Sequence, residues 1–144
     1  MTTSSSNIKQ AVPFFAVADI MKSLQFYIEG LGFQIKMSWK PSGKIEWCWI
    51  ERDGVALMLQ QFQNQNSQIK KGQGVSICFI CEDALSLYDE FLDNNLNPAE
   101  PFVGNNMWDV GIEDPDGYQL HFESNTDVPE GTKYSEWKKS ASKI

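Results

Sequence analysis

The amino-acid sequence predicts an α+β fold built from two copies of one βαβββ unit. Segments in the two halves of the chain match at a constant offset of 63 residues, which is the pattern of an internal repeat. Each half also carries the same order of patterns, namely an apolar run, a helical spacing and three strand-like segments. With 144 residues the chain suits one compact domain, so the copies are parts of a single fold.

The repeat is clearest at the turn before the last strand of each copy. Residues 53–60 lie over residues 116–123, and both segments begin with Asp-Gly and continue with period-two alternation. Such matches in register are hard to obtain by chance, so they indicate a duplicated unit. The same offset aligns three further sets: 12–17 with 75–80, Leu24 with Leu87, and Ile45, Trp47 and Trp49 with Trp108, Val110 and Ile112.

The first unit, residues 11–61, begins with an apolar run over 12–17, which is typical of a strand covered on both faces. Asp19 follows as a helix N-cap, because its carboxylate can accept a free backbone N–H. The helical spacing of apolar residues continues to Leu31, and glycines at 30 and 32 supply the stop. Three strands are expected near 33–39, 44–51 and 54–61.

The second unit, residues 73–124, repeats this order. After the strand at 75–80, Asp83 is expected to cap a helix that ends before Pro98. Three strands should follow near 99–103, 106–113 and 117–123. Three segments lie outside the units: a disordered polar tail at 1–10, a linker at 62–72 rich in Gln and Asn, and a C-terminal tail at 125–144 that favours a short helix with Tyr134 and Trp137 on one face.

Composition excludes several classes of partner. Twelve basic and nineteen acidic residues give a net charge of -7, which would repel a nucleic-acid backbone and attract a cationic small molecule. No apolar stretch approaches a membrane span, and the polar start lacks the apolar core of a signal peptide, so a cytoplasmic location is expected. Cys48, Cys78 and Cys81 are interpreted as ordinary thiols, because residues three apart on a strand face opposite sides.

Three short motifs point to a known family. Residues 26–33 read FYIEGLGF, residues 114–118 read DPDGY, and residues 17–19 read VAD. At these spacings the motifs resemble the vicinal oxygen chelate superfamily of glyoxalase I, bleomycin-resistance proteins and extradiol dioxygenases, over roughly residues 11–124. The resemblance implies that the two units form an open eight-stranded, barrel-like cup. Many relatives are dimers, some of which exchange units between chains, so a homodimer is expected.

The resemblance also indicates which positions to examine for metal ligands. The metal enzymes of the superfamily place four ligands in the cup, and the corresponding positions here are Val12, Met58, Val75 and His121. Only His121 suits a divalent cation, and one imidazole does not make a metal site. We therefore expect no cofactor, no metal and no catalytic residues. The alternative is a metal-dependent lyase, isomerase or dioxygenase of the glyoxalase type that uses His121, with Gln60 and Glu123 brought in by a shift of the alignment.

The alternation of side chains along the strands predicts which residues face the cup. Met58 and His121 should face inward on the last strand of each unit, because the flanking leucines belong to the face covered by helices. The register at the first turn places Trp47 and Trp49 beside Met58, and the same register places Trp108 beside His121. A one-residue bulge would reverse this assignment. The other interpretation is that the tryptophans form core or dimer contacts.

These observations favour a metal-free binding protein that sequesters an aromatic or cationic ligand in an apolar, Trp-lined cavity, as the resemblance to bleomycin-resistance proteins implies. Two further hypotheses stay open. One is a non-metal enzyme that uses His121 with Glu123 or Glu46 as acid and base, and the other is a structural or regulatory partner. The predicted ligand-binding residues are Phe14, Trp47, Trp49, Met58, Phe79, Trp108, His121 and Glu123.

Overall fold

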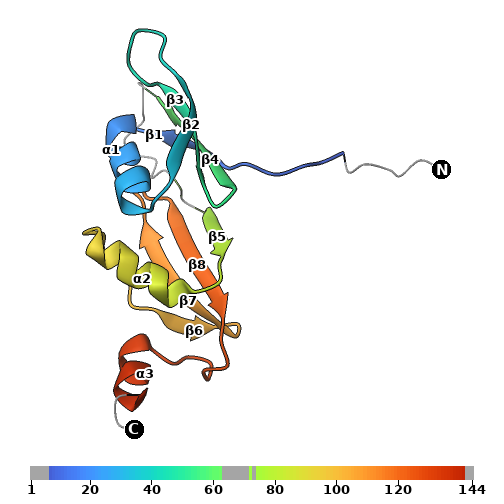
Figure 1. Ribbon diagram of the computed structural model, residues 1–144, viewed down its shortest axis with the longest axis vertical. Coiled ribbons are helices and arrows are strands. Elements are labelled where there is room, and N and C mark those ends of the chain that lie inside the picture. The colour runs from blue at the N-terminus through green and yellow to red at the C-terminus, as the bar shows by residue number, and fades with distance from the viewer. Residues whose placement is uncertain (1–6, 63–71, 73, 142–144) are drawn as a thin grey trace, which may run out of the picture.

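The computed structural model describes residues 7–62, 72 and 74–141. It contains two four-stranded mixed sheets with few helices, which is the predicted α+β fold (Figure 1). The elements follow the duplicated βαβββ order, and one additional helix stands at the C-terminal end. The predicted tail at 1–10 and linker at 62–72 lie mostly outside the described residues.

The first unit forms a sheet of order β1-β4-β3-β2, in which β1 is parallel to β4 and the other neighbours are antiparallel. Asp19 caps the first helix as predicted, because its carboxylate accepts the backbone N–H groups of Met21 and Lys22. The helix continues as a π-helical segment, η1. The elements are β1 Phe14–Val17, α1 Ile20–Leu24, η1 Gln25–Gly30, β2 Gln34–Trp39, β3 Trp47–Arg52 and β4 Val55–Gln61.

The second unit repeats this topology with the strand order β5-β8-β7-β6. Asp83 caps its helix by accepting the N–H of Ser86. Both hairpins turn near the predicted positions, one between β3 and β4 and one between β7 and β8. The elements are β5 Ser76–Ile80, α2 Ala84–Asp93, β6 Phe102–Gly104, β7 Met107–Glu113 and β8 Gln119–Asn125, followed by α3 Tyr134–Ala141.

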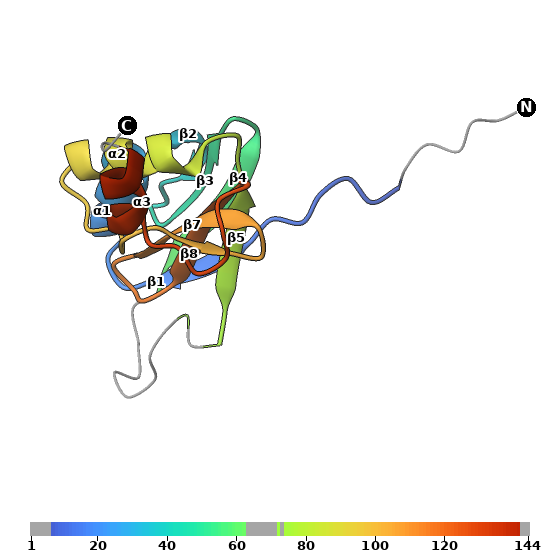
Figure 2. The ribbon, with the colours of Figure 1, turned by 90° about the horizontal axis from the view of Figure 1, so that it is seen from below.

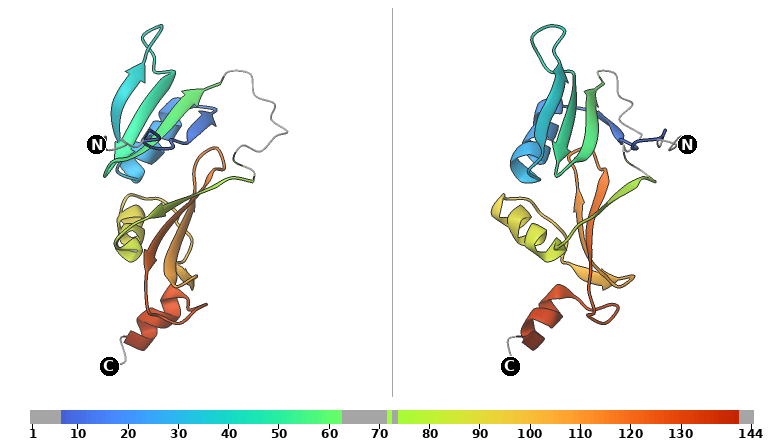
Figure 3. Two further views of the ribbon diagram at one scale, coloured as in Figure 1. Left: turned by 90° about the vertical axis from the view of Figure 1, so that its right-hand side faces the viewer. Right: turned by 45° about the vertical axis from the view of Figure 1, so that its right-hand side comes forward.

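The two units follow one another along the long axis of the molecule (Figures 1 and 3). Figure 2 shows the three helices gathered on one side, so each sheet has one face covered by helices and one face turned away from them. The sheets are not closed into a barrel, which agrees with an open cup. No helix in the described part of the chain has the length and apolar character needed to cross a membrane.

A continuous core joins the units. Phe33 of the first unit meets the ring of Phe79 edge to face at 6.2 Å, and Phe79 stacks on Phe122 at 4.7 Å. On the central strands β3, β4, β7 and β8, alternating residues that point toward the helices are buried, including Leu57 in the first sheet and Leu120 in the second. Burial of these residues fixes the strand registers, because a shift by one residue would turn them to the uncovered face. The uncovered face of each sheet carries the other side chains of these strands.

Polar contacts fasten the same junction. The Tyr118 ring stacks on Phe15 at 4.0 Å, and its hydroxyl donates to the Ala16 carbonyl at 3.1 Å and accepts the Ala16 N–H at 3.2 Å. The buried Tyr27 hydroxyl donates to Asp114 at 2.7 Å. Burial, and then the adjacent Asp114 carboxylate, raise the pKa of Tyr27 well above its ordinary value. The DPDGY turn is thus an anchor between the units as well as a hairpin connection.

Candidate functional site

The open face of the first sheet is rich in large apolar side chains. Strand pairing sets Phe14, Met58, Trp49 and Met37 in one row across the four strands, since Phe14 lies opposite Met58 and Trp49 lies between Met58 and Met37. The next row contains Trp47 beside Trp39. We call this surface the aromatic face; its members are Phe14, Met37, Trp39, Trp47, Trp49 and Met58.

The aromatic face is accessible. Phe14, Met37 and Trp39 are 49%, 52% and 53% exposed, whereas Cys48, Leu57 and Leu59, which point to the opposite side of the sheet on β3 and β4, are buried. The Trp49 indole N–H donates to Glu51 at 2.7 Å, which fixes the plane of that ring. An array of indole and thioether groups held on strands presents a surface on which a planar molecule can stack.

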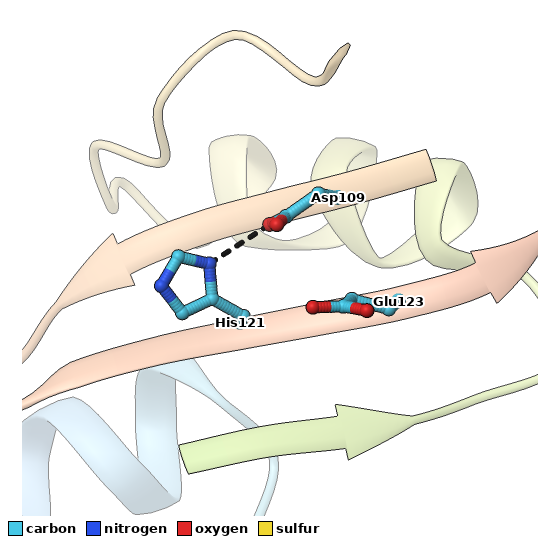
Figure 4. Close-up of side chains that lie close together, drawn as sticks. All are labelled: Asp109, His121 and Glu123. Atoms are coloured by element: carbon cyan, nitrogen blue, oxygen red, sulfur yellow. Dashed lines mark hydrogen bonds and ion pairs between the residues drawn. The ribbon is translucent and has the colours of Figure 1, made fainter. Parts of the chain in front are cut away.

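The open face of the second sheet is polar. His121 on β8 lies between Cys78 of β5 and Gly111 of β7, and Glu123 lies beside Asp109. Nδ1 of His121 is 2.9 Å from Oδ1 of Asp109, and Glu123 lies next to this pair (Figure 4). We call Asp109, His121 and Glu123 the polar cluster.

The contact with Asp109 favours one tautomer of the neutral imidazole. An ionised carboxylate can only accept a hydrogen bond, so the neutral ring carries its proton on Nδ1 and leaves a lone pair on Nε2. His121 is therefore oriented to accept a proton or a hydrogen bond. Opposite the ring, a Cβ added at Gly111 would lie 3.5 Å from His121, so the glycine leaves this side of the imidazole uncovered.

Cys78 borders the polar cluster. Its thiol donates to the Glu123 carboxylate at 3.5 Å. Burial, and then the charge of Glu123, raise the pKa of Cys78, which keeps it a thiol rather than a thiolate at neutral pH.

Two predicted site residues lie elsewhere. The prediction that Trp108 shares the face of His121 is wrong: Trp108 pairs with Ser124, is 4% exposed, and packs against Trp137 of α3 at 5.5 Å. Phe79 pairs with Phe122 on the face covered by helices, where it belongs to the core. Both residues contribute to packing rather than to the open faces.

A small difference in spacing explains the correction at Trp108. Cys48 and Ile50 hold the buried positions on β3 that Val110 and Ile112 hold on β7, so β7 is one residue off the 63-residue offset. The first hairpin closes with Arg52 opposite Val55, whereas the second closes with Glu113 opposite Gln119 and has a longer turn.

The remaining predicted residues form two groups in separate sheets. Phe14, Trp47, Trp49 and Met58 gather on the aromatic face, and His121 and Glu123 belong to the polar cluster. Asp109 was missed by sequence reasoning, because the assumed register assigned its neighbour Trp108 to the open face. Alternation along β7 would have found Asp109 once Val110 and Ile112 were recognised as the buried positions.

Comparison with known families identifies the fold. The family model described as the Glyoxalase/Bleomycin resistance protein/Dioxygenase superfamily matches residues 8–122. The chain belongs to this superfamily. A search of curated proteins gave no match.

Several solved structures have the same fold. The virulence protein STM3117 from Salmonella typhimurium is 22% identical, with a TM-score of 0.62 over 84% of this chain and 100% of that chain. TnmS3, an antibiotic binding protein from Streptomyces sp. CB03234, is 17% identical, with a TM-score of 0.63 over 85% and 100%. A glyoxalase/bleomycin resistance protein/dioxygenase from Nocardioides is 15% identical, with a TM-score of 0.64 over 88% and 89%.

The polar cluster is the group of side chains in the described residues that could hold a metal ion in this superfamily member. One ligand atom from each of Asp109, His121 and Glu123 lies within 4.8 Å of the others. The superfamily positions at Val12, Met58 and Val75 offer no suitable donor.

A separate cleft of about 450 Å³ lies at the junction of the units. Phe33, Phe79 and Phe122 supply apolar lining, and Arg52 and Asp83 supply charge. Arg52 already forms a bidentate ion pair with Glu90, with contacts of 2.7 and 3.0 Å. This cleft is a concave surface distinct from the aromatic face, and binding experiments must distinguish the two.

Proposed function

We propose that this protein binds a small planar aromatic or cationic molecule and sequesters it without covalent chemistry. The observation that carries the proposal is the aromatic face, where three tryptophans and two methionines lie on one accessible sheet surface. Indole rings stack on planar molecules and attract cations through their electron-rich faces. The net charge of -7 adds a long-range attraction for a cationic guest.

Membership of the superfamily supports the same proposal. The superfamily description includes bleomycin-resistance proteins, and TnmS3, which shares the fold, is described as an antibiotic binding protein. In this proposal the aromatic face supplies most of the binding energy. His121 and Glu123 supply polar contacts, since small-molecule sites combine apolar walls with a few orienting polar groups.

We further propose that the protein is a homodimer. Each sheet leaves one face without a covering helix, and the aromatic residues of the first face exceed what a small core requires. A second copy laid over these faces would enclose the bound molecule. Multi-angle light scattering at micromolar concentration is expected to give twice the chain mass of 16.4 kDa; a monomer mass would contradict the dimer.

The function is tested by a thermal-shift screen of the full chain against bleomycin-type drugs, fluoroquinolones, other planar aromatic compounds and non-aromatic amines as controls. A ligand present at about a hundred times its dissociation constant adds about 2.7 kcal/mol to the free energy of unfolding. We expect stabilisation by planar aromatic compounds, strongest for those with a positive charge, together with quenching of tryptophan fluorescence. If no compound shifts the midpoint at millimolar concentration, sequestration is wrong.

A further inference from the structure

We infer that the polar cluster binds one divalent transition-metal ion of the zinc type, through Asp109, His121 and Glu123. This site differs from the four superfamily positions, of which only His121 is a member. It also departs from our expectation of a protein without metal, which rested on those four positions, and it shares His121 and Glu123 with the metal-dependent alternative. The inference does not depend on the aromatic face, which lies in the other sheet.

One pair of donor atoms already lies at nearly the spacing that a single ion requires, and the third donor lies nearby. Donors bound about 2.1 Å from one ion are about 3.0–3.4 Å from each other in tetrahedral or octahedral geometry. Nδ1 of His121 and Oδ1 of Asp109 are 2.9 Å apart, and the donor atoms of all three residues lie within 4.8 Å of one another. Binding of one ion would draw the Glu123 carboxylate toward this pair.

The backbone holds these donors in place. Asp109 lies directly opposite Glu123 across the β7–β8 ladder, and His121 lies two residues before Glu123 on the same face. Donors on paired strands keep their relative positions better than donors on loops do. Ion binding at Nδ1 also requires that the neutral imidazole carry its proton on Nε2, the ring nitrogen that does not contact Asp109 (Figure 4).

The charge of the cluster also calls for a cation. Within residues 7–62, 72 and 74–141, neither Asp109 nor Glu123 forms an ion pair with a lysine or arginine; His121 is the ion-pair partner of Asp109. Two carboxylates and one imidazole suit zinc, manganese or iron(II), whereas an all-oxygen set would suit calcium or magnesium.

The site is partly shielded yet reachable. The side chains of His121 and Asp109 are 30% and 15% exposed, so an ion could enter from the open face and would be only partly hydrated there. Gly111 leaves space beside the imidazole. Three protein donors leave at least one coordination position for water or for a donor atom of a bound small molecule.

The test uses the full chain, stripped with a chelator and titrated with Zn²⁺ by calorimetry and with Co²⁺ by visible absorption. We expect one equivalent to bind, with d–d bands of a low-symmetry Co²⁺ site. Asp109→Asn, His121→Ala and Glu123→Gln should each weaken binding by about tenfold or more. Glu46→Gln, a carboxylate change in the first unit, and Trp47→Ala on the aromatic face serve as controls that leave metal affinity unchanged.

The near-isosteric Asp109→Asn variant keeps the experiment interpretable if His121→Ala unfolds. Its circular dichroism spectrum without metal should match that of the parent, so that a loss of affinity reports the donor rather than the fold. Absence of stoichiometric binding at millimolar Zn²⁺, or equal affinity of all cluster variants and controls, would overturn the inference. Because the titrations contain only metal, failure here is distinct from failure of the aromatic-ligand proposal.

Discussion

The open faces of the two sheets occupy equivalent places in a duplicated unit and carry opposite chemistry. Trp47 and Trp49 on β3 correspond to Asp109 and Gly111 on β7, as the shared pairing with the last strands shows. Likewise, Met58 on β4 corresponds to His121 on β8. The buried faces, in contrast, are apolar in both units. Packing in the repeated unit thus requires apolar residues at the covered positions of both sheets. The uncovered positions are not constrained in this way, and they form an aromatic surface in one unit and a polar cluster in the other.

The largest expected effect is on the free energy of unfolding, which should fall more when a buried tryptophan is removed than when an exposed one is removed. Trp108→Ala removes a buried indole that packs on α3 and should lower the free energy of unfolding by about 3–5 kcal/mol. Trp39→Ala, at a residue that is 53% exposed, should cost less than about 1 kcal/mol. Urea denaturation followed by circular dichroism measures both. If the two substitutions lower the free energy of unfolding equally, Trp108 on the covered face is no more tightly packed than Trp39 on the uncovered face.

A smaller effect should appear in ligand binding at the aromatic face. Trp47→Ala is expected to weaken binding of a confirmed aromatic ligand by about 1–3 kcal/mol, the scale of a lost aromatic or cation–π contact. Fluorescence titration gives the dissociation constant. Trp137→Phe on α3 is the matched control, since it alters a tryptophan far along the chain from the aromatic face. If Trp47→Ala and Trp49→Ala both bind as tightly as the parent, the cleft beside Phe79 becomes the site to examine.

The smallest expected effect is the change in affinity for the aromatic ligand when His121 is replaced. In buffer with a chelator, His121→Ala should weaken ligand binding by about 1 kcal/mol if the imidazole makes one neutral hydrogen bond. The same titration with Asp109→Asn tests whether the carboxylate orients the ring, because the amide keeps the shape but changes the hydrogen bond to Nδ1. If His121→Ala binds the aromatic ligand as tightly as the parent, the ligand contacts the first sheet and not His121.

Much of the fold follows from local pattern. The N-caps at Asp19 and Asp83, the Asp-Gly turn at 53–54 and the buried leucines of β4 and β8 each have a local physical cause that sequence periodicity exposes. The part of the aromatic face on β3 and β4 was predictable for the same reason, whereas Met37 and Trp39 on β2 were missed, since β2 pairs with β3 across an irregular register. The first hairpin has a two-residue turn, so the alternation of β3 follows directly from that of β4.

The second sheet was less predictable because its register depends on a longer turn. One added residue between β7 and β8 exchanges the covered and open faces of β7, and this moved Trp108 into the core and Asp109 into the polar cluster. The contact of Asp109 with His121 joins two strands, and no local pattern encodes it. Alternation within β7 itself, with Val110 and Ile112 both buried, is the stronger guide where a turn is long.

The junction at the DPDGY turn makes the two units complementary halves. Ala16 and Tyr27 of the first unit satisfy their hydrogen bonds with Tyr118 and Asp114 of the second, so each half alone would leave polar groups unpaired beside an open core. When the two halves are produced as separate polypeptides, we therefore expect each to bind the other and to complete its fold on binding. Each half, fused to a different protein, would then reassemble when those two proteins come together, so the pair could serve as a two-part reporter of their association.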